Sequence, residues 1–187
     1  MMERTLMLVK PEGVKRALIG RIISRMEDSG LKVVAIKMVV PDSKTAGVHY
    51  IADKKWLNDT GSRTIQAYRD KGVVIKETPV QVATRIRNLL IKSLAGNPVV
   101  AIVFEGNEAA FVARKITGST EPRKADPSTI RGLFSTDSYE LSDSIGRPIR
   151  NIVHASEDAK TAKREIGVWF SPKELIQYKR ADEDALY

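Results

Sequence analysis

Short apolar runs alternate with helical repeats along most of this chain. Residues 5–9 form a largely apolar stretch that ends at a proline and a glycine, which is typical of a short buried strand. From residue 14 the apolar side chains recur at three- and four-residue intervals, as on one face of a helix, and Gly30 stands where such a helix would end. The segment 31–40 is rich in β-branched residues and stops at Pro41, which predicts a second strand.

Helix caps mark the next elements. Asp42 or Ser43 can cap a short helix, and a Thr-Pro pair at 78–79 predicts a longer helix that reaches about residue 94. Between these two helices, residues 53–77 are polar and follow no clear period. We interpret that stretch as an insertion.

The second half of the chain continues this alternation. Residues 99–104 form a continuous apolar strand, and a helix is expected from about 107 to 117. Residues 119–150 are rich in Pro, Ser, Thr, Asp and Arg and indicate a long loop region, which inside a compact domain is usually functional. Residues 151–154 then predict a short strand, and Ser156 can cap the helix that follows. A last short helix is expected from Pro172 to Tyr178.

Without insertions, the predicted order is β-α-β-β-α-β. This order fits an α+β fold of the ferredoxin-like type, with a four-stranded antiparallel sheet and helices packed on one face. We expect a single domain, residues 1–187, with insertions at about 53–77 and 133–150. The fold alone leaves the function open, because RNA-binding and metabolic proteins share it.

Composition narrows the possible partners. The net charge of +8 and a pI near 9.7 favour an anionic partner, such as nucleic acid, a nucleotide or a phospholipid headgroup, although a solvated basic surface would give the same numbers. The absence of cysteine excludes disulfides and thiolate chemistry. No apolar run approaches the roughly 20 residues that cross a bilayer, and the first ten residues lack the layout of a signal peptide, so we expect a cytoplasmic protein with no membrane partner.

His154 is the candidate nucleophile. It ends an apolar strand and immediately precedes a helix N-terminus, whose free N–H groups favour anions. A neutral imidazole accepts a phosphoryl group, and a carboxylate on its other nitrogen fixes the tautomer; Glu165 on the following helix is placed to return toward the ring. The sequence leaves open which nitrogen attacks. His49, the other of the two histidines, lies inside a helical pattern and is interpreted as structural.

Phosphoryl transfer also needs positive charge and hydrogen-bond donors around the phosphate oxygens. Arg114, Thr120 and Arg131 lie near the long loop and could supply them, although each arginine taken singly is more often a surface residue. Lys10 stands at a strand end, where it can meet a phosphate or a ribose. The chain has neither of the usual glycine-rich phosphate loops nor a His/Asp/Glu cluster with the sequence spacing of a metal site, so no metal ligand is predicted. A metal would arrive as magnesium on a nucleotide.

An ordered set of motifs resembles the nucleoside diphosphate kinase family. Residues 4–14, Arg-Thr-Leu-Met-Leu-Val-Lys-Pro-Glu-Gly-Val, look like its N-terminal strand and turn. Residues 150–156, Arg-Asn-Ile-Val-His-Ala-Ser, look like the segment around its phosphorylated histidine. Further matches follow in the family's order, at 49–50, 98–101, 105–106, 118–122, 129–132, 169–170 and 174–175. The resemblance covers nearly the whole chain outside the two insertions.

This resemblance implies a ping-pong phosphotransferase. A nucleoside triphosphate would phosphorylate His154, and a nucleoside diphosphate of another base would collect the group. Glu165 would orient the histidine, and Tyr50 would pack close to it. Lys10 and Asn151 would reach the ribose hydroxyls and a phosphate, while the phosphates would be held by Arg114, Thr120 and Arg131. Family members need magnesium and assemble as hexamers or tetramers, so a homo-oligomer is expected.

Three departures from the family pattern stand out. Ala155 occupies a position where the family usually has glycine. The aromatic that clamps the base in relatives falls near Arg87, whose guanidinium plane could stack on a base instead. The stretch from Leu133 to Arg150 is longer than usual, which leaves the oligomeric state open.

The sequence also allows two other functions. A nucleic-acid-binding domain of the same fold agrees with the basic pI, but such domains stack bases on strand aromatics and the predicted strands carry only Phe104. Nucleic acid is therefore not expected as the main partner. A catalytically inactive nucleotide sensor would lack a nucleophile or a phosphate ligand, and apart from the base clamp no expected position is vacant.

Overall fold

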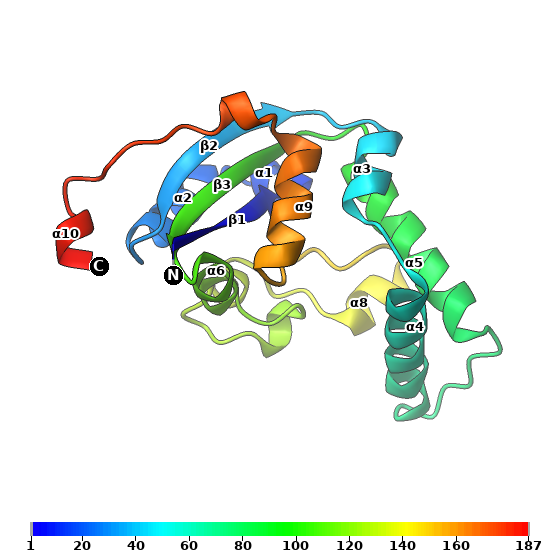
Figure 1. Ribbon diagram of the computed structural model, residues 1–187. Coiled ribbons are helices and arrows are strands. Elements are labelled where there is room, and N and C mark those ends of the chain that lie inside the picture. The colour runs from blue at the N-terminus through cyan, green and yellow to red at the C-terminus, as the bar shows by residue number, and fades with distance from the viewer. Residues whose placement is uncertain (1, 187) are drawn as a thin grey trace.

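The computed structural model describes residues 2–186, and four strands form one antiparallel sheet in the order β2-β3-β1-β4 (Figure 1). The strands are β1 (Met2–Val9), β2 (Lys32–Val39), β3 (Val99–Asn107) and β4 (Val153–Ala155). β1 lies between β3 and β4, and its register places Leu8 opposite His154. The predicted ferredoxin-like fold is confirmed.

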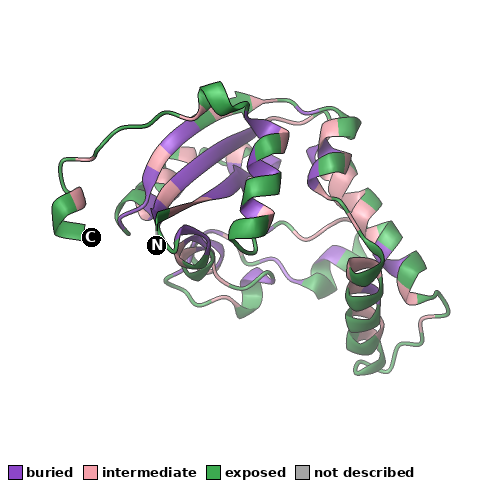
Figure 2. Ribbon diagram, in the orientation of Figure 1, coloured by how far each residue is buried: buried purple, intermediate pink, exposed green. Residues whose placement is uncertain are grey.

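Both faces of the sheet are covered, so the expectation of helices on one face only was wrong. Met7 and Val9 pack under α2 (Ile19–Glu27) and α6 (Ala109–Thr117). Leu6 and Leu8 point to the other face, where α9 (Ala159–Trp169) and α3 (Ser43–His49) cover them. Figure 2 shows the strands buried between these layers. Coverage of both faces explains why the strands are continuously apolar and do not alternate with polar residues.

Local sequence accounts for most helix boundaries. The first predicted helix is divided into α1 (Pro11–Lys15) and α2, because Ala17 takes a positive φ of 55° between them. Asp42 caps α3 by accepting from the backbone N–H of Thr45. α5 (Pro79–Leu94) begins with a capping box between Thr78 and Gln81. The cap of α9 is Asp158, so the cap predicted at Ser156 was wrong.

The polar stretch after α3 is mostly a helix. α4 (Lys54–Arg69) is capped by Asp53 and runs beside α5 (Figure 1). The two helices are in close contact at Gly61, where a Cβ would lie 1.8 Å from the carbonyl oxygen of Pro79. The absence of a side chain at Gly61 therefore permits the pairing of α4 with α5.

The region 119–150 is ordered, and contains the short helices η1 (Pro122–Lys124), α7 (Ile130–Phe134) and α8 (Tyr139–Ser144). Asp137 fixes the C-terminal part of this region. Its carboxylate accepts from the Arg147 guanidinium at 2.7 and 3.0 Å and from the Arg150 N–H at 2.6 Å. This fixed loop leads directly into β4.

The last segment runs along the outer edge of β2. η2 (Pro172–Glu174) is shorter than the helix predicted to reach Tyr178, and α10 (Glu183–Leu186) follows the extended tail. The Ile176 N–H donates to Val34 O at 2.8 Å, and buried Lys32 donates to Tyr178 O and to Glu183. Within residues 2–186, no helix is long and apolar enough to span a bilayer.

Candidate active site

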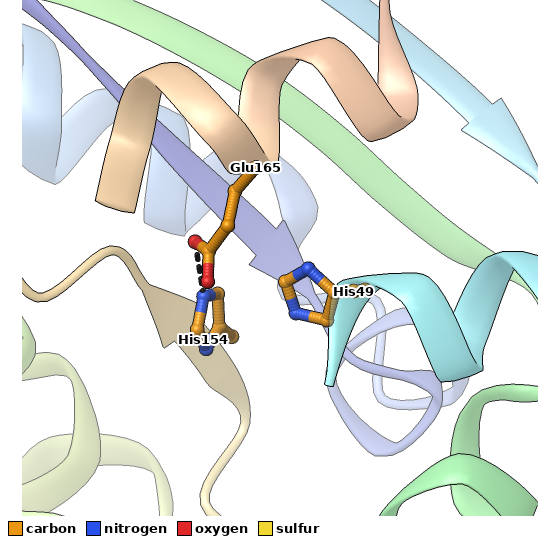
Figure 3. Close-up of side chains that lie close together, drawn as sticks. All are labelled: His49, His154 and Glu165. Carbon is orange, nitrogen blue, oxygen red and sulfur yellow. Dashed lines mark hydrogen bonds and ion pairs between the residues drawn. The ribbon is translucent and has the colours of Figure 1, made fainter. Parts of the chain in front are cut away.

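His154 and Glu165 form the centre of the site (Figure 3). His154 lies in β4, Glu165 points down from α9, and the Nε2 atom of the imidazole lies 2.8 Å from Oε2 of the carboxylate. An ionised carboxylate only accepts hydrogen bonds, so this contact places the proton on Nε2. The Nδ1 atom then keeps its lone pair, and it points away from Glu165 (Figure 3).

Glu165 is held in its ionised form by its neighbours. Burial alone would raise its pKa, but hydrogen bonds from His154 and Ser156 and the charge of Arg164 bring the pKa below its ordinary value. The Ser156 hydroxyl donates to Oε2 at 2.6 Å, and Arg164 donates to Oε1 at 3.1 Å. Both carboxylate oxygens are therefore fixed, and so is the ring that they orient.

The backbone entering β4 is strained. Ile152 is a buried β-branched residue with φ of 70°, a conformation that such residues rarely adopt. Its carbonyl accepts from the Lys10 N–H at 2.8 Å, and its own N–H donates to Glu12 at 3.2 Å. Such strain persists only when the surroundings hold it, and it is common beside active sites.

Lys10 lies buried at the end of β1. Its ammonium group donates to Oδ1 of Asn151 at 2.6 Å, and the Asn151 amide donates to the Thr120 carbonyl at 3.0 Å. Burial, together with the charge of Arg131, lowers the pKa of Lys10 to about 8, against the opposing effect of Glu12. Three of the predicted residues thus meet in one network.

Arg131 is anchored by backbone carbonyls. Its guanidinium donates to Gly118 O at 2.9 Å, Val153 O at 3.0 Å and Asn151 O at 3.3 Å. Burial and the nearby charge of Arg114 lower the pKa of Arg131 to about 10. A guanidinium has five N–H groups, so two remain for a ligand. Arg114 is exposed in the last turn of α6.

Two aromatic rings from the end of α3 pack beside His154. The ring centroid of Tyr50 lies 6.4 Å from that of His154, and the centroid of His49 lies 4.5 Å from it. The Tyr50 hydroxyl is buried without a hydrogen-bond partner among the described residues, and burial raises its pKa. Tyr50 therefore lies where it was predicted, close to the histidine.

Arg87 is used in a different way from the predicted base clamp. Its guanidinium donates to Tyr50 O at 2.6 Å and to Gly47 O at 2.8 Å, which closes the C-terminal end of α3. The assignment of Arg87 to a nucleotide base stays a prediction.

Three potential metal-ligand atoms lie within 4.8 Å of one another, one each from His49, His154 and Glu165. Their sequence separations gave no sign of this grouping. Oε2 of Glu165 is already shared by His154 and Ser156 at hydrogen-bond distance, so the geometry fits a hydrogen-bonded pair better than a set of metal ligands.

Three residues that contact the His154–Glu165 pair were not predicted from the sequence. Ser156 follows His154 by two residues and so points to the same side of the chain, a period that could have indicated its role. Arg164 adjoins Glu165 in sequence and offered a weaker signal. No sequence signal indicated His49, because its contact with His154 exists only in the folded chain.

Comparison with known proteins identifies the family of this chain. The family model described as nucleoside diphosphate kinase matches residues 3–67 and 80–175. The curated nucleoside diphosphate kinase of Pyrobaculum aerophilum is 39% identical over 180 residues, which cover 94% of this chain and 98% of that protein. A crystal structure of an NDP kinase from the same organism has a TM-score of 0.91 at 38% identity, covering 95% of this chain and 100% of that one.

A second structure carries ligands. The nucleoside diphosphate kinase of Borrelia burgdorferi, in a transition-state mimic with bound vanadate and ADP, has a TM-score of 0.83 at 40% identity, covering 98% of this chain and 96% of that one. The fold, the site and these matches together define a phosphotransferase that acts on nucleotides. The chain belongs to the nucleoside diphosphate kinase family.

Proposed function

We propose that this enzyme works by a ping-pong mechanism through a phosphohistidine at His154. The γ-phosphoryl group of a nucleoside triphosphate is transferred to the ring, and a nucleoside diphosphate then removes it. The observation that carries the proposal is the hydrogen bond between Nε2 and Glu165, which commits one ring nitrogen and leaves Nδ1 as the attacking atom. As Nδ1 forms its bond to phosphorus, positive charge develops on the ring and Glu165 stabilises it.

The groups around the cleft are suited to phosphate. Lys10, Arg114 and Arg131 supply charge, and Thr120 and Asn151 supply hydrogen-bond donors. Because these groups are cationic or neutral, magnesium belongs to the substrate and is carried on the phosphate oxygens of the nucleotide. The bound vanadate and ADP of the B. burgdorferi relative agree with such a site.

A cavity of about 720 Å³ adjoins Lys10 and extends to Leu90 and Ile149. His154, Arg87, Arg114 and Arg131 do not line this cavity, so the nucleobase is not assigned to it. The proposed contacts are to ribose and phosphates, which all nucleotides share, so all four common nucleoside triphosphates should serve as donors. The proposed stacking of Arg87 on the base is tested by Arg87→Ala, which should then raise the KM for nucleotides.

We also propose that the chain forms a homo-oligomer, a hexamer or a tetramer. Exposed apolar side chains of β2 and the residue after it, Ile36, Met38 and Val40, give the sheet edge an apolar surface. Light scattering coupled to size-exclusion chromatography measures the assembly directly, and a monomer at micromolar concentration contradicts this proposal.

Labelling with γ-³²P-ATP and magnesium tests the mechanism. The protein should become labelled, and the label should be lost in acid and kept in base, since phosphoserine behaves in the opposite way. His154→Gln should remove both labelling and turnover while the fold survives. Labelling of a folded His154→Gln variant would show that another residue is the acceptor.

A further inference from the structure

His49, the last residue of α3, is buried against α9 and the nucleophile. Its side chain is almost inaccessible, and the indole N–H of Trp169 donates to its Nδ1 at 3.3 Å. An indole nitrogen only donates, so Nδ1 must offer a lone pair. Burial and the nearby groups His154, Arg164 and Lys10 lower the pKa of His49 well below its usual value, so the ring is neutral. Its one proton is therefore on Nε2.

The Nε2–H group of His49 has no conventional acceptor. Among the described residues, Nε2 is buried and makes no hydrogen bond. A buried donor without a partner is uncommon and costs free energy, so it calls for an explanation. The two histidine rings are nearly perpendicular, at 83°, with centroids 4.5 Å apart. Figure 3 shows an edge of the His49 ring turned toward the flat side of His154.

We propose that His49 is a positioning residue for the nucleophile: its Nε2–H lies against the face of the His154 ring, fixes the rotation of that ring and disfavours its protonated form. This inference rests on the proposed function of His154. An N–H group directed at an aromatic face is a weak hydrogen bond, and here it satisfies a donor that has no other acceptor.

Glu165 cannot fix the ring by itself. A single hydrogen bond at Nε2 leaves the ring free to turn about that contact, whereas a second ring packed perpendicular to it does not. The two neighbours contact different parts of the ring. The carboxylate accepts from Nε2–H at its edge, and the His49 ring stands nearly perpendicular to it. Together they hold the ring in one orientation and leave Nδ1 free to attack phosphorus.

Other groups near His154 are accounted for. Arg164 on α9 is paired with Glu165, Lys10 lies at the end of β1, Tyr50 ends α3, and Arg131 extends from α7. Tyr50 also has a buried hydroxyl without a partner among the described residues, but its ring centroid lies farther from that of His154 than the centroid of His49 does, 6.4 against 4.5 Å.

Three variants test the inference. His49→Phe keeps a ring and removes the N–H, whereas His49→Gln keeps a donor near the position of Nε2. Trp169→Phe removes the indole N–H that fixes the tautomer of His49. Their folding is checked by circular dichroism and thermal melting. Single-turnover phosphorylation is then measured from pH 5 to 9.

In His49→Phe, the fall of the phosphorylation rate at acid pH (the acid limb of the pH–rate profile) should move to higher pH. The rate at pH 6 should therefore decrease about five- to tenfold relative to the rate at pH 8. Trp169→Phe should move the limb in the same direction, because His49 can then present a lone pair to His154. His49→Gln should return the limb close to that of the wild type.

An acid limb that stays in place in folded His49→Phe and folded Trp169→Phe overturns the inference, as does a His49→Gln variant that behaves like His49→Phe. If His49→Phe does not fold, Trp169→Phe decides alone. Failure of the proposed function is recognised separately, since the wild type would then carry no acid-labile label. Normal labelling with an unmoved limb rejects only the role of His49.

Discussion

Nζ of Lys10 lies 2.6 Å from Oδ1 of Asn151, although 141 positions separate the two residues in sequence. The contact joins the end of β1 to the turn that enters β4. The Asn151 amide also donates to Thr120 O, so one neutral side chain connects a buried cation to the loop that holds Thr120. The same cation titrates near physiological pH, which leads to a first prediction.

Nucleotide affinity should fall above about pH 8. Burial lowers the pKa of Lys10 to about 8, so the free enzyme loses this charge as the pH rises through that value. The KM for nucleoside diphosphates should therefore increase between pH 7.5 and 9, measured by steady-state kinetics. Lys10→Met should have a high KM that no longer responds in this range. Lys55→Met removes an exposed lysine and should behave like the wild type.

Glu165→Gln should slow the formation of the phosphoenzyme and move the acid limb of the rate to lower pH. The carboxylate favours the protonated imidazole, so its loss leaves the ring neutral at lower pH. Rapid-quench phosphorylation between pH 5 and 9 gives both quantities, with Glu157→Gln, an exposed residue before α9, as the matched control. An unmoved limb in Glu165→Gln removes the carboxylate from the proposed role.

Arg114→Ala and Arg131→Ala should each lower the transfer rate by about 100-fold, the usual scale for one preorganised charge contact. Their stabilities should differ. Arg131 holds three carbonyls and Arg114 is exposed, so only Arg131→Ala should lower the free energy of unfolding, measured by urea titration. Full activity in both variants contradicts the site.

Acid should destabilise the protein in two separate ranges. His49 is neutral in the fold because burial lowers its pKa, whereas the unfolded chain binds a proton near pH 6.5, so stability falls as the pH decreases below that value. Glu165, whose pKa is lowered, loses its contribution only below about pH 4.5. In urea titrations between pH 7 and 5, His49→Phe should therefore lose less stability than the wild type. An equal loss in the two proteins would mean that His49 is not held neutral.

Gly61→Ala should destabilise the protein by about 1–3 kcal/mol or more, since the added Cβ meets the Pro79 carbonyl oxygen at 1.8 Å and must separate α4 from α5. Gly20→Ala, in α2 with nothing within 4 Å of its Cβ, should be neutral or stabilising by less than about 1 kcal/mol. Thermal melting of the two variants makes the comparison. Equal melting temperatures would contradict the close helix contact.

The sequence predicts most of this fold because each strand is a continuous apolar run bounded by Pro, Gly or a helix cap. Helix α4 escaped prediction because its sequence is polar on average and only Gly61 in it is buried, although Asp53 caps its start and it lies beside α5. At the site, His154 and Glu165 follow from a strand end and the next helix. His49 could not be assigned, because its role depends on a ring contact 105 positions away in sequence, between His49 and His154.

Arg131 has a second consequence, which follows from the position of β4 at the edge of the sheet. The Val153 carbonyl belongs to that edge strand, and the guanidinium donates to it at 3.0 Å. Backbone groups left open at a strand edge are available for pairing with another chain. The side chain proposed to bind phosphate thus also occupies a backbone acceptor of the nucleophile's own strand, and Arg131→Ala would leave that acceptor without this donor.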